Sequence, residues 1–377
     1  MNDFAITNNN HSNLDGLRAI GILLILTKHF FENFINLQIC WVGIDLLFAL
    51  SGLLITGILI ETKEDSKYFQ KFYVRRILRI FPLYYFVVIG FTIYVYFLSN
   101  SPESFNYFKN NIGYFYTYTQ NWYFIKNGNP SGAYLNHTWS LAIDEQIYIF
   151  WPLFIWLCKT KKQLMYLCGG ILIFSLCFRI GYNIYLSQHT PVNPYAYMYH
   201  TLCRIDSFGA GALLYCLLRF KHSFLTSKRM LYIGGTSLLL FLVFIFLDNS
   251  TDYTGYFMRN FGITVAGIHS TFWLYLGVKK NNKVVNFIFS SRVFIYLGKI
   301  SYSLYVYHFL LLALLVSRIF QFLSEYLHIK SLLLSYIICL LITFIISILS
   351  YEYFEKPIIK IKRRFSYRKT YKNKFAG

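Results

Sequence analysis

The stretch LDGLRAIGILLILTKHF, residues 14–30, determines how the rest of the chain is interpreted. It is an apolar segment that carries Arg18 and, eleven positions later, His29. At 100° per residue, eleven steps come within about 20° of whole turns, so a helix places both side chains on one face, about 16 Å apart along its axis. Lys28 points about 100° away from that face. The sequence therefore predicts a helix with two ionisable side chains aligned along one face.

An ionisable side chain inside a membrane-length helix is costly. An arginine there costs about 2.5–3.5 kcal/mol unless it faces a partner or a wet cavity. We therefore interpret Arg18 and His29 as part of a functional site. In the alternative, structural interpretation, Arg18 extends to the lipid headgroups and His29 makes an ordinary hydrogen bond between helices.

The composition is that of a polytopic membrane protein. Of the 377 residues, 56% are hydrophobic and 14% are charged, which excludes both a soluble globular domain and a disordered chain. Apolar stretches of about 20 residues predict an all-α integral membrane protein, a bundle of about ten transmembrane helices. We expect these spans at residues 14–34, 41–61, 80–99, 137–158, 163–186, 201–219, 229–247, 257–278, 293–317 and 331–353.

Cationic residues are distributed unevenly between the connectors of these spans. When the connectors are assigned alternately to the two sides, one set holds most of the cations, at 63–79, 159–162, 219–229, 279–292 and 356–374. The other set holds Lys109, Lys126, Arg259, Arg318 and Lys330. By the positive-inside rule the richer set is cytoplasmic. We therefore expect both termini inside, the 100–136 loop outside, Arg18 near the cytoplasmic end of its span and His29 in the outer half.

The organisation expected is a polar N-terminal segment at 1–13, a membrane domain at 14–357 and a basic cytoplasmic tail at 358–377. The first thirteen residues lack a basic region and a cleavage site, so we expect no cleaved signal peptide and a multi-pass protein of the cytoplasmic (inner) membrane. The basic stretch 360–374 is interpreted as a headgroup-binding or disordered end. The stretch 112–125 is too polar to span and is expected as a short interfacial helix or a loop.

Metal and nucleic-acid partners are not expected. The seven cysteines lie in or beside apolar segments without CxxC spacing or interleaved histidines, which argues against zinc and disulfide frameworks. The formal net charge of +20 lies almost wholly on one side of the predicted membrane, so membrane lipids rather than nucleic acid are the expected partner. No HExxH, P-loop, GxSxG or EF-hand pattern occurs.

A cluster of arginines follows the second predicted span, in FYVRRILRIFP at residues 72–82, which Pro82 closes. Arg75 and Arg79 are four residues apart and share a helical face, and Arg76 lies beside them. Forked guanidinium groups suit phosphate oxygens, so the cluster is a candidate site for a phosphate-rich donor. The alternative is a topological anchor at the cytoplasmic surface.

Two carboxylates lie in the fourth predicted span, HTWSLAIDEQIYIFWP at residues 137–152. Asp144 and Glu145 fall about 10–12 Å below its outer end, at the depth expected for His29. A carboxylate beside an imidazole can fix its tautomer and stabilise the imidazolium, as in a general base or nucleophile. The alternative is a salt bridge from either carboxylate to Arg204 or Arg179.

Other polar residues complete the set within the predicted spans. The segment CRIDSFGAGALLY contains Arg204 and Asp206, with glycines that permit close helix packing. We assign an acceptor-side or structural role to Asp45, Trp139, Arg204, Asp206 and His308. Trp139 and its neighbouring aromatic residues suit either sugar stacking or an interfacial belt. For Glu355, an ion pair with Lys356 at the membrane edge is favoured.

Seven motifs, in order along residues 14–357, resemble those of acyltransferase family 3, the membrane O-acyltransferases of surface carbohydrates. They are LDGLRAIGILLILTKH, GIDLLFALSGLLIT, FYVRRILRIFP, HTWSLAIDEQIYIFWP, RIDSFGAGALL, GKISYSLYVYH and YFEKP. The resemblance implies transfer of an acyl group, usually acetyl, from cytoplasmic acyl-CoA to a hydroxyl of a glycan or glycan-lipid at the outer face, such as lipopolysaccharide or capsule. It implies acetyl-CoA as a donor substrate and no permanently bound cofactor. It places the family's Arg–x10–His pair on Arg18 and His29, and its arginine motif on Arg75, Arg76 and Arg79.

The sequence departs from the family pattern at two positions. Asp144 stands where family members usually have glutamate, and Ile147 where they have an aromatic residue, so the role of the carboxylate stays open between Asp144 and Glu145. No esterase-like domain follows the last span, so the chain is expected to act as a stand-alone membrane module. A transporter or flippase for a glycan-lipid, using the same buried ions as a proton relay, is the competing class. A structural scaffold would not account for the aligned buried charges.

Overall fold

The computed structural model describes residues 12–35, 37–98, 105–128, 134–189, 195–279 and 283–365. Within these ranges the regular secondary structure is entirely helical, which confirms the all-α prediction. Most of the predicted N-terminal segment and the tail beyond residue 365 lie outside the described residues.

One long helix corresponds to each of the ten predicted spans. These are α1 (Ser12–Phe31), α2 (Val42–Thr62), α3 (Tyr68–Ile93), α6 (Trp139–Leu157), α7 (Lys161–Gln188), α9 (Thr201–Arg219), α10 (Ser227–Asp248), α11 (Ile263–Lys279), α13 (Arg292–Tyr326) and α14 (Leu332–Leu349). Among the described residues, eight helices are long and apolar enough to cross a membrane, and α1 and α6 are not in that set. These two helices carry the four residues predicted to be catalytic, namely Arg18, His29, Asp144 and Glu145. The count of ten spans and the sides of the termini stay predictions.

Shorter helices connect the long ones. They are η1 (Gln38–Trp41), η2 (Tyr94–Leu98), α4 (Asn106–Tyr116), α5 (Gln120–Asn127), η4 (Asn136–Thr138), α8 (Ala196–Tyr199), η5 (Met258–Gly262), α12 (Lys283–Phe289), η6 (Ser350–Glu355), α15 (Lys356–Ile361) and η7 (Lys362–Phe365). The aromatic stretch at 112–125 therefore forms parts of α4 and α5, and the loop interpretation is wrong.

The sequence suggested that Pro82 ends the helical segment with the arginine cluster, and this is wrong. Pro82 lies inside α3, which continues from the arginine cluster into the third predicted span without interruption. Pro82 has no N–H to donate to the carbonyl oxygen of Leu78, four residues earlier, yet α3 does not end there. A contact with α13 also holds this part of α3. The hydroxyl of Tyr302 on α13 donates a hydrogen bond of 2.7 Å to the carbonyl oxygen of Ile80. This continuity places the arginine cluster and the membrane span on one rigid helix.

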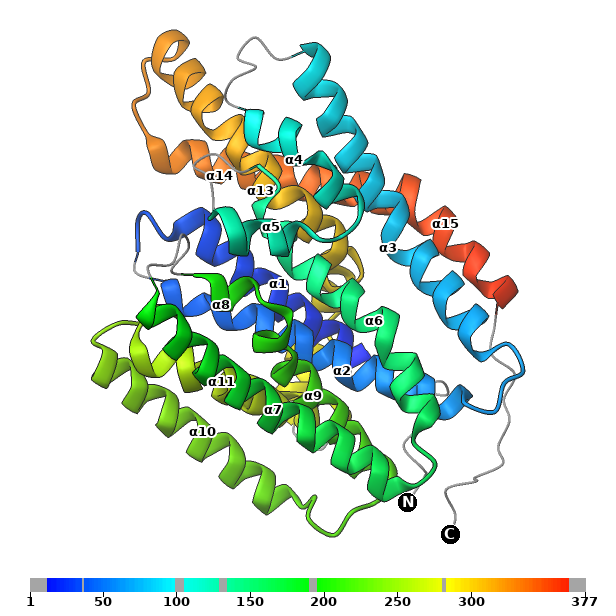
Figure 1. Ribbon diagram of the computed structural model, residues 1–377. Coiled ribbons are helices and arrows are strands. Elements are labelled where there is room, and N and C mark those ends of the chain that lie inside the picture. The colour runs from blue at the N-terminus through cyan, green and yellow to red at the C-terminus, as the bar shows by residue number, and fades with distance from the viewer. Residues whose placement is uncertain are drawn as a thin grey trace.

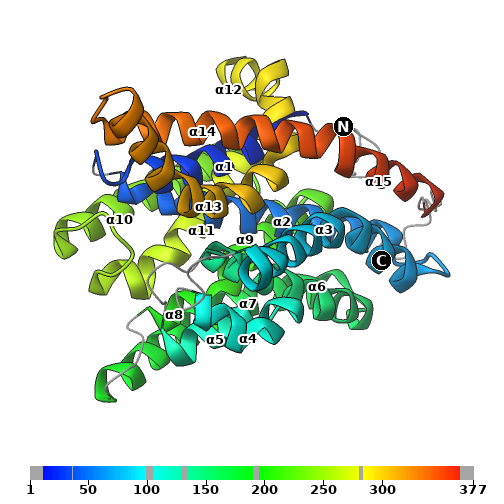
Figure 2. The ribbon, with the colours of Figure 1, turned by 90° about the horizontal axis from the view of Figure 1, so that it is seen from above.

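Helix α2 lies at the centre of the bundle (Figure 1). It packs against α1, α9 and α11, and α1 packs in turn against α13. Figure 2 shows α14 and α15 on one side of the molecule, α4, α5 and α6 on the other, and α2 between them. The expected close packing at the glycines of α9 is confirmed, because a Cβ atom on Gly211 would lie 1.8 Å from the carbonyl oxygen of Ala49. The α2–α9 pair thus forms a closely packed wall next to α1.

Candidate active site

A cavity of about 460 Å³ lies between α1, α2, α3, α6 and α13. Its charged lining consists of five cationic and three acidic side chains: Arg18, Arg76, Arg79, Lys299 and Lys362, and Asp15, Asp144 and Glu145. The helices that were predicted to carry the site therefore meet around one space. With all of these groups ionised, cations outnumber carboxylates, which favours an anionic ligand.

The cationic residues gather at the Arg18 end of the cavity. Arg18 is half-buried and its Nη1 lies 2.6 Å from Oδ1 of Asp15. Arg76 lies over the rings of Phe72 and Tyr148, 5.7 and 5.5 Å from their centroids. Within the described parts of the chain, neither Arg76 nor Arg79 has a carboxylate within 4.0 Å. Their forked donors are therefore directed at the cavity without an acidic partner.

The structure separates the members of the predicted arginine cluster. Arg76 and Arg79 line the cavity, and Arg75 does not. Instead, Nη1 of Arg75 donates to the backbone carbonyl oxygens of Lys362 and Phe365, at 3.3 and 3.2 Å. The expectation that Arg75 and Arg79 share one face of the site is wrong: Arg79 lines the cavity with Arg76, because the rotation of α3 in the bundle turns Arg75 toward the C-terminal segment.

Asp144 and Glu145 line the cavity on its Arg76 side, and Arg76 is the nearby cation for both. One oxygen of each carboxylate, Oδ1 and Oε1 respectively, is buried without a hydrogen-bond partner in the described residues. No described contact joins either carboxylate to His29, so the expected carboxylate–imidazole pair is not formed in this structure. The carboxylates instead adjust the charge around Arg76.

His29 belongs to a cluster of three imidazoles. Its ring centroid lies 5.2 Å from that of His308, and the His308 ring lies 4.9 Å from that of His137. The sequence analysis missed His137, although it precedes Asp144 by seven residues and therefore falls near the same helical face. The cluster is not arranged as a group of metal ligands among the described residues.

Hydrogen bonds to the backbone fix the tautomers of two of these imidazoles. Nδ1 of His308 lies 2.7 Å from the carbonyl oxygen of Tyr305, and Nε2 of His137 lies 3.1 Å from that of Val306. Because a carbonyl oxygen only accepts, each of these nitrogens carries the proton. Nε2 of His308 and Nδ1 of His137 are therefore lone-pair acceptors, both buried and without a partner in the described residues. One of these acceptors belongs to the ring next to His29, that of His308, and the other lies one ring further away.

Tyr305 separates the cavity from the histidine cluster. It lines the cavity with Ser140, and its hydroxyl donates to the carbonyl oxygen of His137 at 2.7 Å. Its ring centroid lies 5.4 Å from that of His308. On α1, Ile25 lines the cavity and His29 follows four residues later on the same face. The face predicted from the Arg18–His29 spacing therefore runs from the cationic end of the cavity to the histidine cluster.

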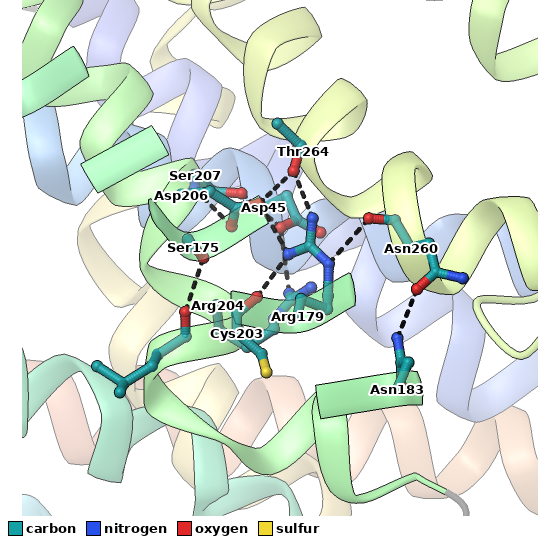
Figure 3. A network of polar contacts seen from close by, with 11 residues as sticks. Asp45, Ser175, Arg179, Asn183, Cys203, Arg204, Asp206, Ser207, Asn260 and Thr264 are labelled. Carbon is teal, nitrogen blue, oxygen red and sulfur yellow. Dashed lines mark hydrogen bonds and ion pairs between the residues drawn. The ribbon is translucent and has the colours of Figure 1, made fainter. Parts of the chain in front are cut away.

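The acidic and basic residues of α2 and α9 lie in a separate network (Figure 3). Nη2 of Arg204 lies 3.1 Å from Oδ1 of Asp45, and Nη1 of Arg179 lies 2.8 Å from Oδ2 of Asp206. All four side chains are completely buried. The alternative in which Asp144 or Glu145 pairs with Arg204 or Arg179 is therefore wrong.

This network lies between helices and away from the cavity, so its position fits a structural role rather than acceptor binding. It joins α2, α7, α9 and α11, and none of its four ionised residues lines the cavity. The Arg204 guanidinium lies over the rings of Phe48 and Trp139, and Trp139 is itself buried. Phe48 lines the cavity, so the network supports the cavity wall from behind. A sugar-stacking role for Trp139 does not fit its burial.

Glu355 also differs from the expectation. Lys356 forms its ion pair with Glu352, whereas Glu355 is buried and accepts hydrogen bonds from Ser303 at 2.5 Å and Ser350 at 3.3 Å. Lys356 pairs with Glu352 rather than Glu355 because residues four apart share a helical face and adjacent residues do not. Glu355 therefore anchors the end of η6 to α13.

Comparison with known proteins places the chain in a family. The model of an acyltransferase domain, acyltransferase family 3, matches residues 11–352. The chain belongs to this family, as its motifs suggested. No solved structure matches it.

Curated relatives match over nearly the whole chain. It is 28% identical over 365 residues to a putative peptidoglycan O-acetyltransferase of Bacillus subtilis (YrhL), covering 92% of this chain and 54% of the relative. It is 28% identical over 371 residues to the peptidoglycan O-acetyltransferase OatA of Listeria monocytogenes, covering 92% and 55%. A putative O-acetyltransferase of Staphylococcus aureus (strain COL) is 28% identical over 366 residues, covering 92% and 57%. The chain spans about half the length of these relatives.

Proposed function

We propose that this protein transfers an acetyl group from acetyl-CoA to a hydroxyl of a cell-envelope glycan, with peptidoglycan as the acceptor. The observation that carries the proposal is the cavity along α1, which has unpaired guanidinium groups at one end and adjoins the histidine cluster at the other. Membership of the acyltransferase family supports the reaction class. The names of the relatives favour peptidoglycan over the lipopolysaccharide or capsule considered from the sequence.

The donor is proposed to bind at the cationic end. Coenzyme A carries a diphosphate and a 3′-phosphate, and arginine forks bind phosphate oxygens through two parallel hydrogen bonds. Arg76 and Arg79 present such forks to the cavity, and Arg18 and Lys299 line it with them. The positive-inside rule predicts this end to be cytoplasmic. The pantetheine arm would then extend along α1 toward Tyr305 and His29.

His29 is proposed to move the proton of the acceptor hydroxyl. As a general base it takes that proton while the hydroxyl oxygen attacks the thioester carbonyl carbon. The carbon–sulfur bond breaks, and the imidazolium returns the proton to the departing thiolate, which leaves an ester and free coenzyme A. As a transient acyl carrier, His29 would itself attack the thioester first, and the overall balance would be the same. In both routes the acceptor nitrogen of His308, the ring next to His29, would stabilise a positively charged His29, and His137 would hold the His308 ring from its other side.

The test of this function is release of free thiol by the purified protein supplied with acetyl-CoA and peptidoglycan fragments. We expect release that depends on the acceptor, together with a mass increase of one acetyl group on the acceptor. The competing transporter or flippase class would move a glycan-lipid without chemistry. Absence of thiol release and of acetylated product over a range of glycan acceptors would reject the proposal and favour transport.

Replacing Arg76 and Arg79 by lysine should weaken acetyl-CoA binding by about 1–3 kcal/mol, roughly 5–150-fold, because an ammonium cannot form the bidentate contact. The affinity of the detergent-solubilised protein for acetyl-CoA measures this loss. Arg229→Lys is the matched control, since Arg229 is an exposed arginine on α10 outside the cavity. Wild-type affinity in the Arg76→Lys, Arg79→Lys double variant would contradict donor binding by these arginines and favour their alternative role as topological anchors.

Replacing His308 should slow the chemical step while leaving donor binding intact. His308→Leu removes the acceptor nitrogen beside His29, which we expect to cost about 1.5–3 kcal/mol in the transition state, roughly 10–150-fold in kcat. His308→Gln keeps an acceptor oxygen near the position of Nε2 and should restore part of the rate. The measurement is kcat and KM for acetyl-CoA in both variants. Equal rates for the Leu and Gln variants would show that His308 acts through packing alone.

A further inference from the structure

The C-terminal segment returns to the cavity. Helix α15 and the following η7 pack against α3, and the guanidinium of Arg75 donates to two backbone carbonyl oxygens of η7. This attachment brings the side chain of Lys362 to the cavity lining, beside Arg76 and Arg79. Residues 360–365 are therefore helical, and the expectation of a disordered end is wrong for them, whereas headgroup binding by the tail stays a prediction.

Lys362 lies in an unusually cationic environment. Burial lowers its pKa most, and the positive charges of Arg76, Arg75 and Arg79 on α3 and of Arg18 on α1 lower it further, from 10.5 to about 6. The other charged groups around the cavity are Lys299 on α13, Asp15 beside Arg18, and Asp144 and Glu145 on α6. At neutral pH the Lys362 amine is therefore mostly uncharged.

We propose that Lys362 is an additional phosphate ligand of this cavity, supplied by the C-terminal segment, and that it takes up a proton when a multiply charged phosphate compound binds. The inference rests on the proposed function, in which coenzyme A phosphates enter the cationic end. It adds a residue outside the membrane spans to the donor site. It also makes donor binding depend on pH.

The direction of this dependence follows from the charges. A bound anion offsets the repulsion from the arginines, so the pKa of Lys362 returns toward its ordinary value in the complex. Between these two pKa values, binding takes up about one proton, and the affinity falls by up to tenfold for each unit that the pH rises. Below about pH 6 the amine is already charged and the uptake disappears. Arginine cannot replace this response, because it stays protonated throughout.

Calorimetric titration of the full chain in detergent with coenzyme A tests the proposal. Titrations at pH 7.5 in two buffers with different ionisation enthalpies give the number of protons taken up. Because the carboxylates Asp144 and Glu145 line the same cavity and can also take up protons, we expect the wild type to take up about one proton more than Lys362→Arg or Lys362→Met. Lys362→Met should also bind coenzyme A roughly tenfold or more weakly, because it loses a charge-assisted hydrogen bond. The control is Lys360→Met, which removes an exposed lysine of α15 and should behave as wild type.

The outcomes separate this inference from the proposed function. Proton uptake by Lys362→Met equal to that of the wild type, or an unchanged affinity in that variant, would overturn the role of Lys362. Coenzyme A binding without acetyl transfer by the wild type would overturn the proposed function alone, since Lys362 would still be seen to bind the phosphates. A wild type that does not bind coenzyme A would overturn both.

Discussion

His29→Ala should lower acetyl transfer by about 10²–10⁴-fold while the protein still inserts in the membrane and binds acetyl-CoA. The reason is that this imidazole is the half-buried member of the cluster, and His308 and His137 are already committed to backbone carbonyls through their N–H groups. His308, the ring next to His29, can accept a hydrogen bond from it, but both imidazoles are held in place as acceptors. Removing His29 therefore removes the group placed to exchange a proton with the acceptor hydroxyl.

The measurement is the rate of acceptor-dependent thiol release, with donor affinity determined in parallel. His189→Ala is a suitable control, because His189 is an exposed histidine just beyond α7. Retention of labelled acetyl on the protein after acid quench, in the absence of acceptor, would identify His29 as an acyl carrier rather than a general base. Acceptor-dependent thiol release at the wild-type rate in His29→Ala would show that His29 takes no part in the reaction.

Much of the fold could be predicted because its signals are local. A long helix lies at each of the ten predicted spans, and eight of these helices are long and apolar enough to cross a membrane among the described residues. The alignment of Arg18 with His29 follows from helical geometry alone. The face of α1 that carries Arg18 and His29 borders the cavity at Arg18 and Ile25, and it continues to the histidine cluster at His29.

The choice of partners could not be predicted, because it depends on how helices far apart in sequence are rotated against one another. Arg75 and Arg76 differ by only 100° around α3, yet one faces the C-terminal segment and the other the cavity. Asp45 pairs with Arg204 across 159 positions of sequence, a match that no local pattern specifies. The return of Lys362 to the cavity depends in the same way on tertiary packing of α15 and η7 against α3.

The Arg179–Asp206 pair shows why such packing governs stability. Arg179 on α7 donates to Asp206 at 2.8 Å, to the carbonyl oxygen of Cys203 at 2.5 Å and to that of Asn260 at 3.1 Å, and it also bonds the hydroxyl of Thr264. Thr264 in turn donates to Asp206 at 2.6 Å. One guanidinium thus satisfies acceptors on α9, η5 and α11, and neither charge is exposed.

Arg179→Met should therefore lower the free energy of unfolding by about 3–5 kcal/mol, because it leaves the Asp206 carboxylate buried without its cation. Arg179→Lys should be nearly as destabilising, since one ammonium cannot reproduce the planar set of donors. The Arg179→Met, Asp206→Leu double variant should lose less than the sum of the two single variants, because it removes both buried charges. Denaturant unfolding in detergent measures these differences, with Glu352→Gln as a control that breaks an exposed ion pair and should change stability little. Single variants within 1 kcal/mol of wild type would mean that water reaches the network, and that the wall behind Phe48 is held by apolar packing alone.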